Sequence, residues 1–137
     1  LYLTKTYGRG PPLHLYPDAP EDEAQAWRWT LWAQGHLEPW VQRDQSILPL
    51  RATADWSGVV ATALATLDRA LTSRPWLLGA QFTVADLNVA GILSPSRSAG
   101  LDLGAHKRVR TWLDRCYARP AARETRSRYT DQGARRP

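Results

Sequence analysis

The acidic side chain best placed to do chemistry in this sequence is Asp86, which stands inside the apolar run QFTVADLNVAGIL at residues 81–93. A carboxylate in apolar surroundings is either held by specific hydrogen bonds or poised for proton transfer. Thr83 precedes Asp86 by three residues, the spacing of a helix capping box, in which each side chain accepts from the other residue's amide. Phe82 and Leu87 flank the pair at the positions of a hydrophobic staple. We therefore interpret Thr83, Asp86, Phe82 and Leu87 as a structural cap, and not as a catalytic site.

Other residue patterns that support catalysis are missing from the sequence. His14, His36 and His106 are far apart and only one cysteine is present, so no metal site is expected. The segment GRGPP lacks the glycine spacing of a phosphate-binding loop. Cys116 lies on the inward stripe of its predicted helix and is expected to pack as a small hydrophobic residue, and Asn88 as a hydrogen-bonded core residue. We predict no catalytic residue in this chain.

The segment AWRWTLWAQGHLEPWV, residues 26–41, offers two apolar faces on one predicted helix. Trp29, Trp32, His36 and Trp40 can lie on one face, and Trp27, Leu31 and Gln34 on another. Two apolar faces predict two packing partners. In one interpretation these are the bundle and a neighbouring domain or second subunit. In the other, part of the first face lines a hydrophobic substrate pocket, with Trp29, Trp32, His36 and Trp40 as candidate binding residues.

The helices that would position these residues follow from hydrophobic periodicity. We predict helices over residues 1–7, 20–44 with a bend at Pro39, about 56–71, 83–94 and 104–118, and a short one from Pro120 to about 127. Asp18 is a candidate cap for the second, and Thr53 or Asp55 for the third. No strand pattern is present, so the predicted fold is all-α, a bundle of about five to six helices.

The length of 137 residues fits one domain, and no apolar stretch is long enough to cross a membrane. The net charge of +5 arises mainly in residues 119–137, which hold six arginines against two acidic residues. A nucleic-acid-binding domain should instead carry a basic face interleaved with aromatic residues, so no nucleic-acid partner is expected. The single cysteine favours a reducing, cytoplasmic location.

Three segments together resemble the C-terminal domain of glutathione S-transferases. LDRALTSRPWLLGAQFTVADLNVAGIL is similar to the family's helix, turn and capping box, and VRTWLDRCYARPAARE to a later helix. LYPDAPEDEAQAWRWTLWA is similar to the interdomain linker and first long helix of bacterial members. The resemblance implies that residues 1–7 end a preceding thioredoxin-like domain, 8–19 form a linker, 20–127 form the helical domain, and 128–137 form a disordered basic tail.

The same resemblance implies a function in detoxification. The family conjugates glutathione to small hydrophobic electrophiles, and the helical domain supplies the acceptor pocket and part of a homodimer interface. Its Ser, Tyr or Cys that activates the thiol lies in the thioredoxin-like domain, so we expect this chain to be a fragment that binds no cofactor alone. The alternative is a non-catalytic protein-interaction module of the same family.

Overall fold

The computed structural model describes residues 1–41, 56–94 and 103–134, except for the side chains of residues 56, 57 and 129–134. Within these ranges the chain is helical, and its only β feature is an isolated bridge between Trp76 and Gly79. The all-α prediction is therefore confirmed. The elements in chain order are α1 (Tyr2–Tyr7), α2 (Pro20–His36), α3 (Glu38–Val41), α4 (Trp56–Ala70), α5 (Val84–Ile92), α7 (Lys107–Ala118) and α8 (Pro120–Ala134).

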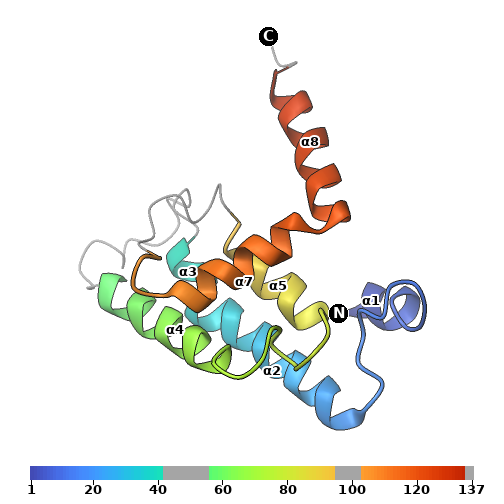
Figure 1. Ribbon diagram of the computed structural model, residues 1–137, viewed down its shortest axis with the longest axis horizontal. Coiled ribbons are helices and arrows are strands. Elements are labelled where there is room, and N and C mark those ends of the chain that lie inside the picture. Colours follow the sequence, from blue (N-terminus) through green and yellow to red (C-terminus); the bar gives the residue numbers. More distant parts are fainter. Residues whose placement is uncertain (42–55, 95–102, 135–137) are drawn as a thin grey trace.

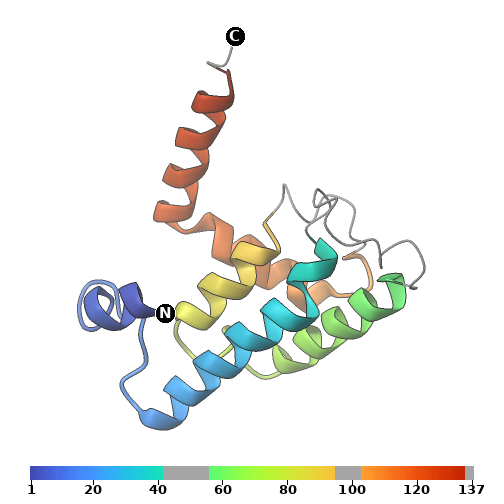
Figure 2. The ribbon, with the colours of Figure 1, turned by 180° about the vertical axis from the view of Figure 1, so that it is seen from behind.

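Four helices form the body of the molecule (Figures 1 and 2). α5 packs on α2 and on α7, and α4 packs on the same two helices, so each helix of the four has two neighbours in the bundle. α5 is apolar on most sides, as the sequence predicted, and its buried residues include Val84, Ala85, Val89 and Ala90. Small residues on α2 (Ala26 and Ala33) are also fully buried. The core lies where these four helices meet.

The first long helix is shorter than predicted. α2 ends at His36 and the chain resumes a helical path only in α3, whereas the sequence suggested one bent helix through residue 44. Pro39 explains the break, because proline at the second position of α3 fits the start of a helix better than its interior. Asp18 does not cap α2: the N-cap residue is Ala19, and Asp18 lies 3.5 Å from the Arg9 guanidinium instead.

The α4 stripe and the turn after it match the sequence pattern. Val60, Ala63, Leu64 and Leu67 are buried in the core. Gly79 has a φ of 133°, which side chains with a Cβ rarely adopt. The proposed caps Thr53 and Asp55 lie outside the described residues.

α7 is capped by a residue from another helix. It begins at Lys107, later than predicted, and its N-cap residue, His106, makes no side-chain hydrogen bond to the helix end. Instead the carboxylate of Asp68 in α4 accepts from the amides of Arg108 (3.0 Å) and Val109 (3.4 Å) and from the Arg108 guanidinium (2.7 Å). A side chain 40 residues away in sequence thus satisfies amides that a helix end leaves without partners.

α8 extends beyond its predicted end. The sequence placed a disordered tail from residue 128, but the helix continues to Ala134. It projects away from the bundle (Figures 1 and 2), and none of its described side chains is fully buried. None of the described helices combines the length and the hydrophobicity needed to span a membrane.

Candidate functional site

A hollow of about 430 Å³ opens between α1, α2 and α5. We call it the α1–α2 hollow. Its α2 lining comes from positions 27, 30 and 34, which share one helical stripe, and α3 continues this stripe at position 38. The full set of lining residues is Leu1, Tyr2, Trp27, Thr30, Gln34, Glu38, Asn88 and Ile92.

A hydrogen-bonded polar pair joins α2 and α5 beside this hollow. The Asn88 amide Nδ2 donates to Thr30 Oγ1 at 2.9 Å, and the Thr30 hydroxyl donates to the Ala26 carbonyl at 2.9 Å. Thr30 is buried and Asn88 is half-buried. Asn88 is thus hydrogen-bonded to a neighbouring helix, as expected, and it also lines the hollow.

The chemistry of this lining suits the binding of a small molecule. It combines the indole of Trp27, which is 44% exposed, with the hydroxyls of Tyr2 and Thr30, two amides and the Glu38 carboxylate. It contains no histidine or cysteine. In the part of the chain that the structure describes, no three His, Cys, Asp or Glu side chains are arranged to hold a metal ion. The hollow can therefore hold a partly apolar molecule with polar groups.

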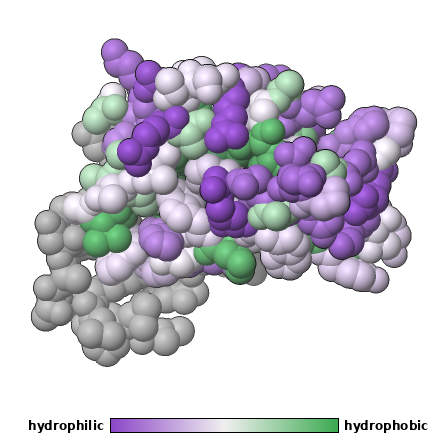
Figure 3. Space-filling view, turned by 90° about the horizontal axis from the view of Figure 1, so that it is seen from below, coloured by the Kyte–Doolittle hydropathy of each residue, from purple (hydrophilic) through white to green (hydrophobic). Residues whose placement is uncertain are grey.

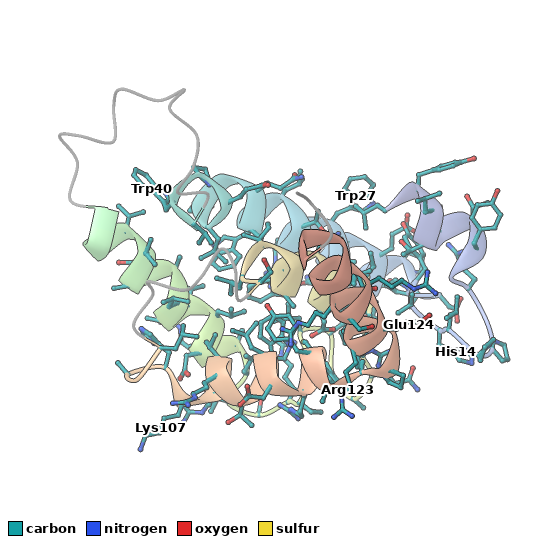
Figure 4. All side chains as sticks on the ribbon, turned by 90° about the horizontal axis from the view of Figure 1, so that it is seen from above. His14, Trp27, Trp40, Lys107, Arg123 and Glu124 are labelled. Carbon is teal, nitrogen blue, oxygen red and sulfur yellow. The ribbon has the colours of Figure 1, made fainter. Side chains whose placement is uncertain are left out.

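The four predicted pocket residues lie elsewhere. Trp29 is only 5% exposed and belongs to the core, where its ring meets Trp32 edge-on at 5.2 Å. The Trp32 ring stacks on His36 with 6.0 Å between centroids, and Trp40 is half-buried in α3. None of these residues lines the α1–α2 hollow. Figure 4 shows Trp27 and Trp40 near opposite ends of the α2–α3 edge.

The residues that do line the hollow belong to the other apolar face of the helix. Sequence analysis grouped Trp27 and Gln34 on that face but gave the pocket to the face richer in tryptophan. The small residues Ala26 and Ala33 could have identified the side of α2 that packs on the bundle, because both have 0% exposure. Trp29 shares this buried side. Among the described residues, its Nε1 is the only buried side-chain nitrogen or oxygen without a hydrogen-bond partner.

Asp86 is the polar centre of the bundle. It is fully buried, and both hydrogen bonds of the capping box with Thr83 are present. Its Oδ1 also accepts from the Leu77 amide at 2.9 Å and from Trp112 Nε1 at 2.8 Å. Burial raises the pKa of this carboxyl group, and hydrogen bonds from the Leu77 amide, from the Thr83 amide and hydroxyl and from the Trp112 indole oppose that rise. With every contact inside the core, Asp86 has a structural role in this chain.

The residues of the predicted staple differ in burial. Phe82 is half-buried and its ring meets Trp76 edge-on at 5.2 Å. Leu87 is 45% exposed. The burial expected of a staple is therefore found at Phe82 alone.

Cys116 is buried and forms no disulfide. Burial raises the pKa of its thiol to about 12, so the group stays protonated at neutral pH. A protonated thiol is a poor nucleophile and a poor metal ligand. The side chain therefore packs as a small hydrophobic residue, as the sequence predicted.

A charged network fixes α1 and the linker against the start of α2. Glu23 accepts hydrogen bonds from Lys5 and from the Tyr16 hydroxyl, both at 2.7 Å. The hydrogen bond from Lys5 lowers the pKa of Glu23, and the same bond raises that of Lys5. The linker is also tied to α5, because the Val84 amide donates to the Leu15 carbonyl at 2.8 Å. These contacts position α1 beside the α1–α2 hollow.

The family model and three of the solved structures that match this chain belong to one family. Residues 38–115 match the family model described as glutathione S-transferase, C-terminal domain. A possible glutathione S-transferase from Rhodopseudomonas palustris is 26% identical, with a TM-score of 0.66 over 87% of this chain and 55% of that chain. A glutathione S-transferase from Xanthobacter autotrophicus is 25% identical, with a TM-score of 0.70 over 87% of this chain and 61% of that one.

A glutathione transferase from Bombyx mori is likewise 25% identical, with a TM-score of 0.68 over 85% of this chain and 54% of that chain. The chain therefore spans between 54% and 61% of the length of these three relatives. No curated protein matches the sequence.

Proposed function

The chain belongs to the glutathione S-transferase C-terminal domain family, and from this premise we propose that it forms the acceptor-substrate side of a glutathione transferase. In this function a thioredoxin-like domain holds glutathione and activates its thiol, and the helical domain holds a small electrophile. The observation that supports the proposal most is the α1–α2 hollow. It lies beside Leu1 and Tyr2, so a domain joined to α1 would lie close to it.

The proposed acceptor wall is made by α2 and α5. Trp27 offers an exposed indole face for an apolar ring, and Thr30, Gln34 and Asn88 offer polar contacts that orient it. The second face of α2, with Trp32 and His36, is assigned to a second copy of the chain in a homodimer. Trp29 is not assigned to the substrate because its side chain is buried within this chain.

A chimaera tests this function. We would join the chain at Leu1 to the glutathione-binding domain of the Xanthobacter autotrophicus relative and measure conjugation of glutathione to 1-chloro-2,4-dinitrobenzene. The chimaera should conjugate, and the 137-residue chain alone should not. Trp27→Ala should raise KM for the electrophile more than it lowers kcat, because it removes binding surface and no reacting group. Trp40→Ala serves as the control outside the hollow.

The alternative is a protein-interaction module without catalysis. The exposed apolar residues of α1 and α2, including Tyr2, Leu3, Trp27 and Leu31, would then contact another protein. A chimaera that folds and binds glutathione but conjugates no electrophile would favour this alternative over the enzyme.

A further inference from the structure

The basic side chains of α7 and α8 gather on one side of the molecule. Residues 103–128 contain eight basic and two acidic side chains, whereas residues 1–41 contain three basic and five acidic ones. Figure 4 shows Lys107 and Arg123 on the α7 side of the bundle, opposite Trp27 and Trp40. We name this surface the basic edge, and it consists of Lys107, Arg108, Arg115, Arg119 and Arg123. We propose that the basic edge binds the phosphate backbone of a nucleic acid.

Aromatic rings hold two of these arginines in place. The guanidinium carbon of Arg115 lies 5.2 Å from the centroid of the Trp76 ring, and that of Arg119 lies 3.9 Å from the Phe82 ring. Trp76 and Phe82 also contact each other edge-on. A guanidinium stacked on a ring keeps the N–H donors at its edge available for a phosphate. Stacking thus orders these side chains before any ligand binds.

The charge of the basic edge is largely unneutralised. Among the described residues, no acidic side chain forms an ion pair with Lys107, Arg115, Arg119 or Arg123; Arg108 alone pairs, with Asp68 at 2.7 Å. A hollow of about 200 Å³ opens within the edge, between α7 and the end of α4. Its lining residues are Leu71, Lys107, Arg108, Thr111 and Arg115. A phosphate group there would meet Lys107 and Arg115, with which no described acidic side chain forms an ion pair.

The dimensions of the edge fit an extended polyanion. Lys107, Thr111, Arg115 and Arg119 recur every four residues, so they follow one side of α7, which also carries the exposed Asp114. At a rise of 1.5 Å per residue, Lys107 and Arg119 are about 18 Å apart along the helix. A nucleic-acid duplex carries one charge per roughly 1.7 Å of its axis, so this length faces about ten phosphates. A single small anion would occupy only part of the edge.

Arginine content and the lack of exposed apolar residues favour a nucleic acid over a membrane. Four of the five residues of the basic edge are arginines, whose planar donors match phosphate oxygens. The large exposed hydrophobic side chains of the described chain lie on α1, the linker, α2, α4 and α5, and none lies on α7 or α8. On the face seen in Figure 3, which is turned away from α8, hydrophobic residues also form separate patches among polar ones. Insertion into a bilayer requires a continuous apolar face.

The structure therefore changes the premise on which the sequence argued against a nucleic-acid partner. That argument placed the charge in a terminal tail. Two residues of the basic edge, Arg119 and Arg123, come from that segment, and the structure places Arg119 at the C-cap of α7 and Arg123 in the helix α8. The aromatic interleaving that the sequence argument required is present as the contacts of Arg115 with Trp76 and of Arg119 with Phe82.

Fluorescence anisotropy with a labelled DNA duplex of about 20 base pairs tests the proposal. At about 50 mM salt the chain should bind with micromolar affinity, and about 200 mM salt should weaken binding roughly 100-fold, as four phosphate contacts predict. Lys107→Gln with Arg123→Gln should weaken binding at least about fivefold and reduce the slope of log K against log salt by about two. The control, Arg9→Gln with Arg28→Gln, removes equal charge from the opposite side and should bind like the parent chain.

Three results would overturn the proposal. The first is no binding at low salt, and the second is equal weakening in the variant and its control, which would indicate net charge alone. The third is competition by polyglutamate as strong as that by duplex DNA, which would indicate an acidic protein partner. Circular dichroism melts of each variant establish that a loss of binding is not a loss of fold.

Discussion

At the scale of single residues, the buried carboxylate of Asp86 has more partners than its sequence motif alone suggests. The spacing of Thr83 and Asp86 predicted a local cap. The structure adds Leu77 and Trp112 as donors to Asp86, so this residue ties the α4–α5 turn, α5 and α7 together. Neither donor could be predicted from spacing, because the partners lie 9 and 26 residues away.

Asp86→Ala should therefore destabilise the fold more than loss of a cap alone. It leaves the amides of Leu77 and Thr83 and the Trp112 indole without their acceptor, and each unsatisfied buried donor costs about 1–3 kcal/mol. We expect the free energy of unfolding in urea to fall by about 3 kcal/mol or more. Thr83→Ala should cost only about 1 kcal/mol, and the exposed Asp114→Ala should change little. Equal losses in all three variants would contradict the role of Asp86.

Asp68 should make stability depend on pH. Burial works against its charge, but hydrogen bonds from the Arg108 side chain and from the amides of Arg108 and Val109 outweigh burial and lower its pKa. A carboxyl group with a lowered pKa binds protons more readily in the unfolded chain, so its stabilising effect is present above about pH 3.9 and is lost as pH falls below it.

Asp68→Asn should remove this contribution. Its unfolding free energy should change less between about pH 5 and pH 3 than that of the parent chain, and it should be lower at pH 5. Urea titrations at several pH values measure the slope of the unfolding free energy against pH. Asp114→Asn is the matched control, and an identical slope for Asp68→Asn and the parent chain would refute the assignment.

At the scale of elements, periodicity predicted which segments are helical but not all of their ends. The buried stripe of α4 could be predicted from local sequence alone, because burial of one side of a helix repeats every three to four residues. It consists of Val60, Ala63, Leu64 and Leu67. The break after α2 has a local cause in Pro39, where the sequence predicted a bend. The start of α7, in contrast, depends on the Asp68 carboxylate of another helix. Such tertiary effects have no local signature.

The placement of α1 should depend on Glu23. Its carboxylate holds Lys5 and Tyr16, and no other described acidic side chain contacts Lys5. Glu23→Ala should speed hydrogen exchange of the α1 amides and leave exchange in α5 unchanged. Asp18→Ala, which removes only the contact with Arg9, should have a smaller effect. Unchanged exchange in α1 would show that other contacts position this helix.

α8 should contribute little to stability despite its length. Deleting residues 128–137 removes the end of the helix, whose described side chains are exposed or half-buried. A disordered tail, as the sequence predicted, would leave the helical content unchanged when it is deleted. We now expect a small loss of helical circular dichroism with a melting temperature within about 2 °C of the parent. A larger fall in melting temperature would mean that the end of α8 contacts the bundle.

At the scale of the whole molecule, hydrophobic and basic surfaces are separated. α1 and α2 expose Tyr2, Leu3, Trp27 and Leu31, and the basic edge lies on the α7 side. The sequence predicted that the face with Trp29, Trp32 and Trp40 would meet a neighbouring domain, a second subunit or a substrate. The tryptophan positions alone could not decide between the faces, because both faces of α2 carry tryptophan and only packing against α5 selects one.

As an isolated chain, the protein should self-associate through this exposed face, which is separate from the Trp32 and His36 face proposed for the homodimer of the whole enzyme. Trp27 is 44% and Leu31 58% exposed on adjacent turns of α2, and exposed apolar side chains that lie together tend to find a partner. Trp27→Ser with Leu31→Ser should shift sedimentation towards the monomer and lower the fluorescence of a bound apolar dye, with little loss of stability. Val59→Ser with Leu87→Ser removes two exposed apolar side chains from α4 and α5 and should leave association unchanged. If that control shifts the chain towards the monomer and the α2 variant does not, copies of the chain associate through α4 and α5.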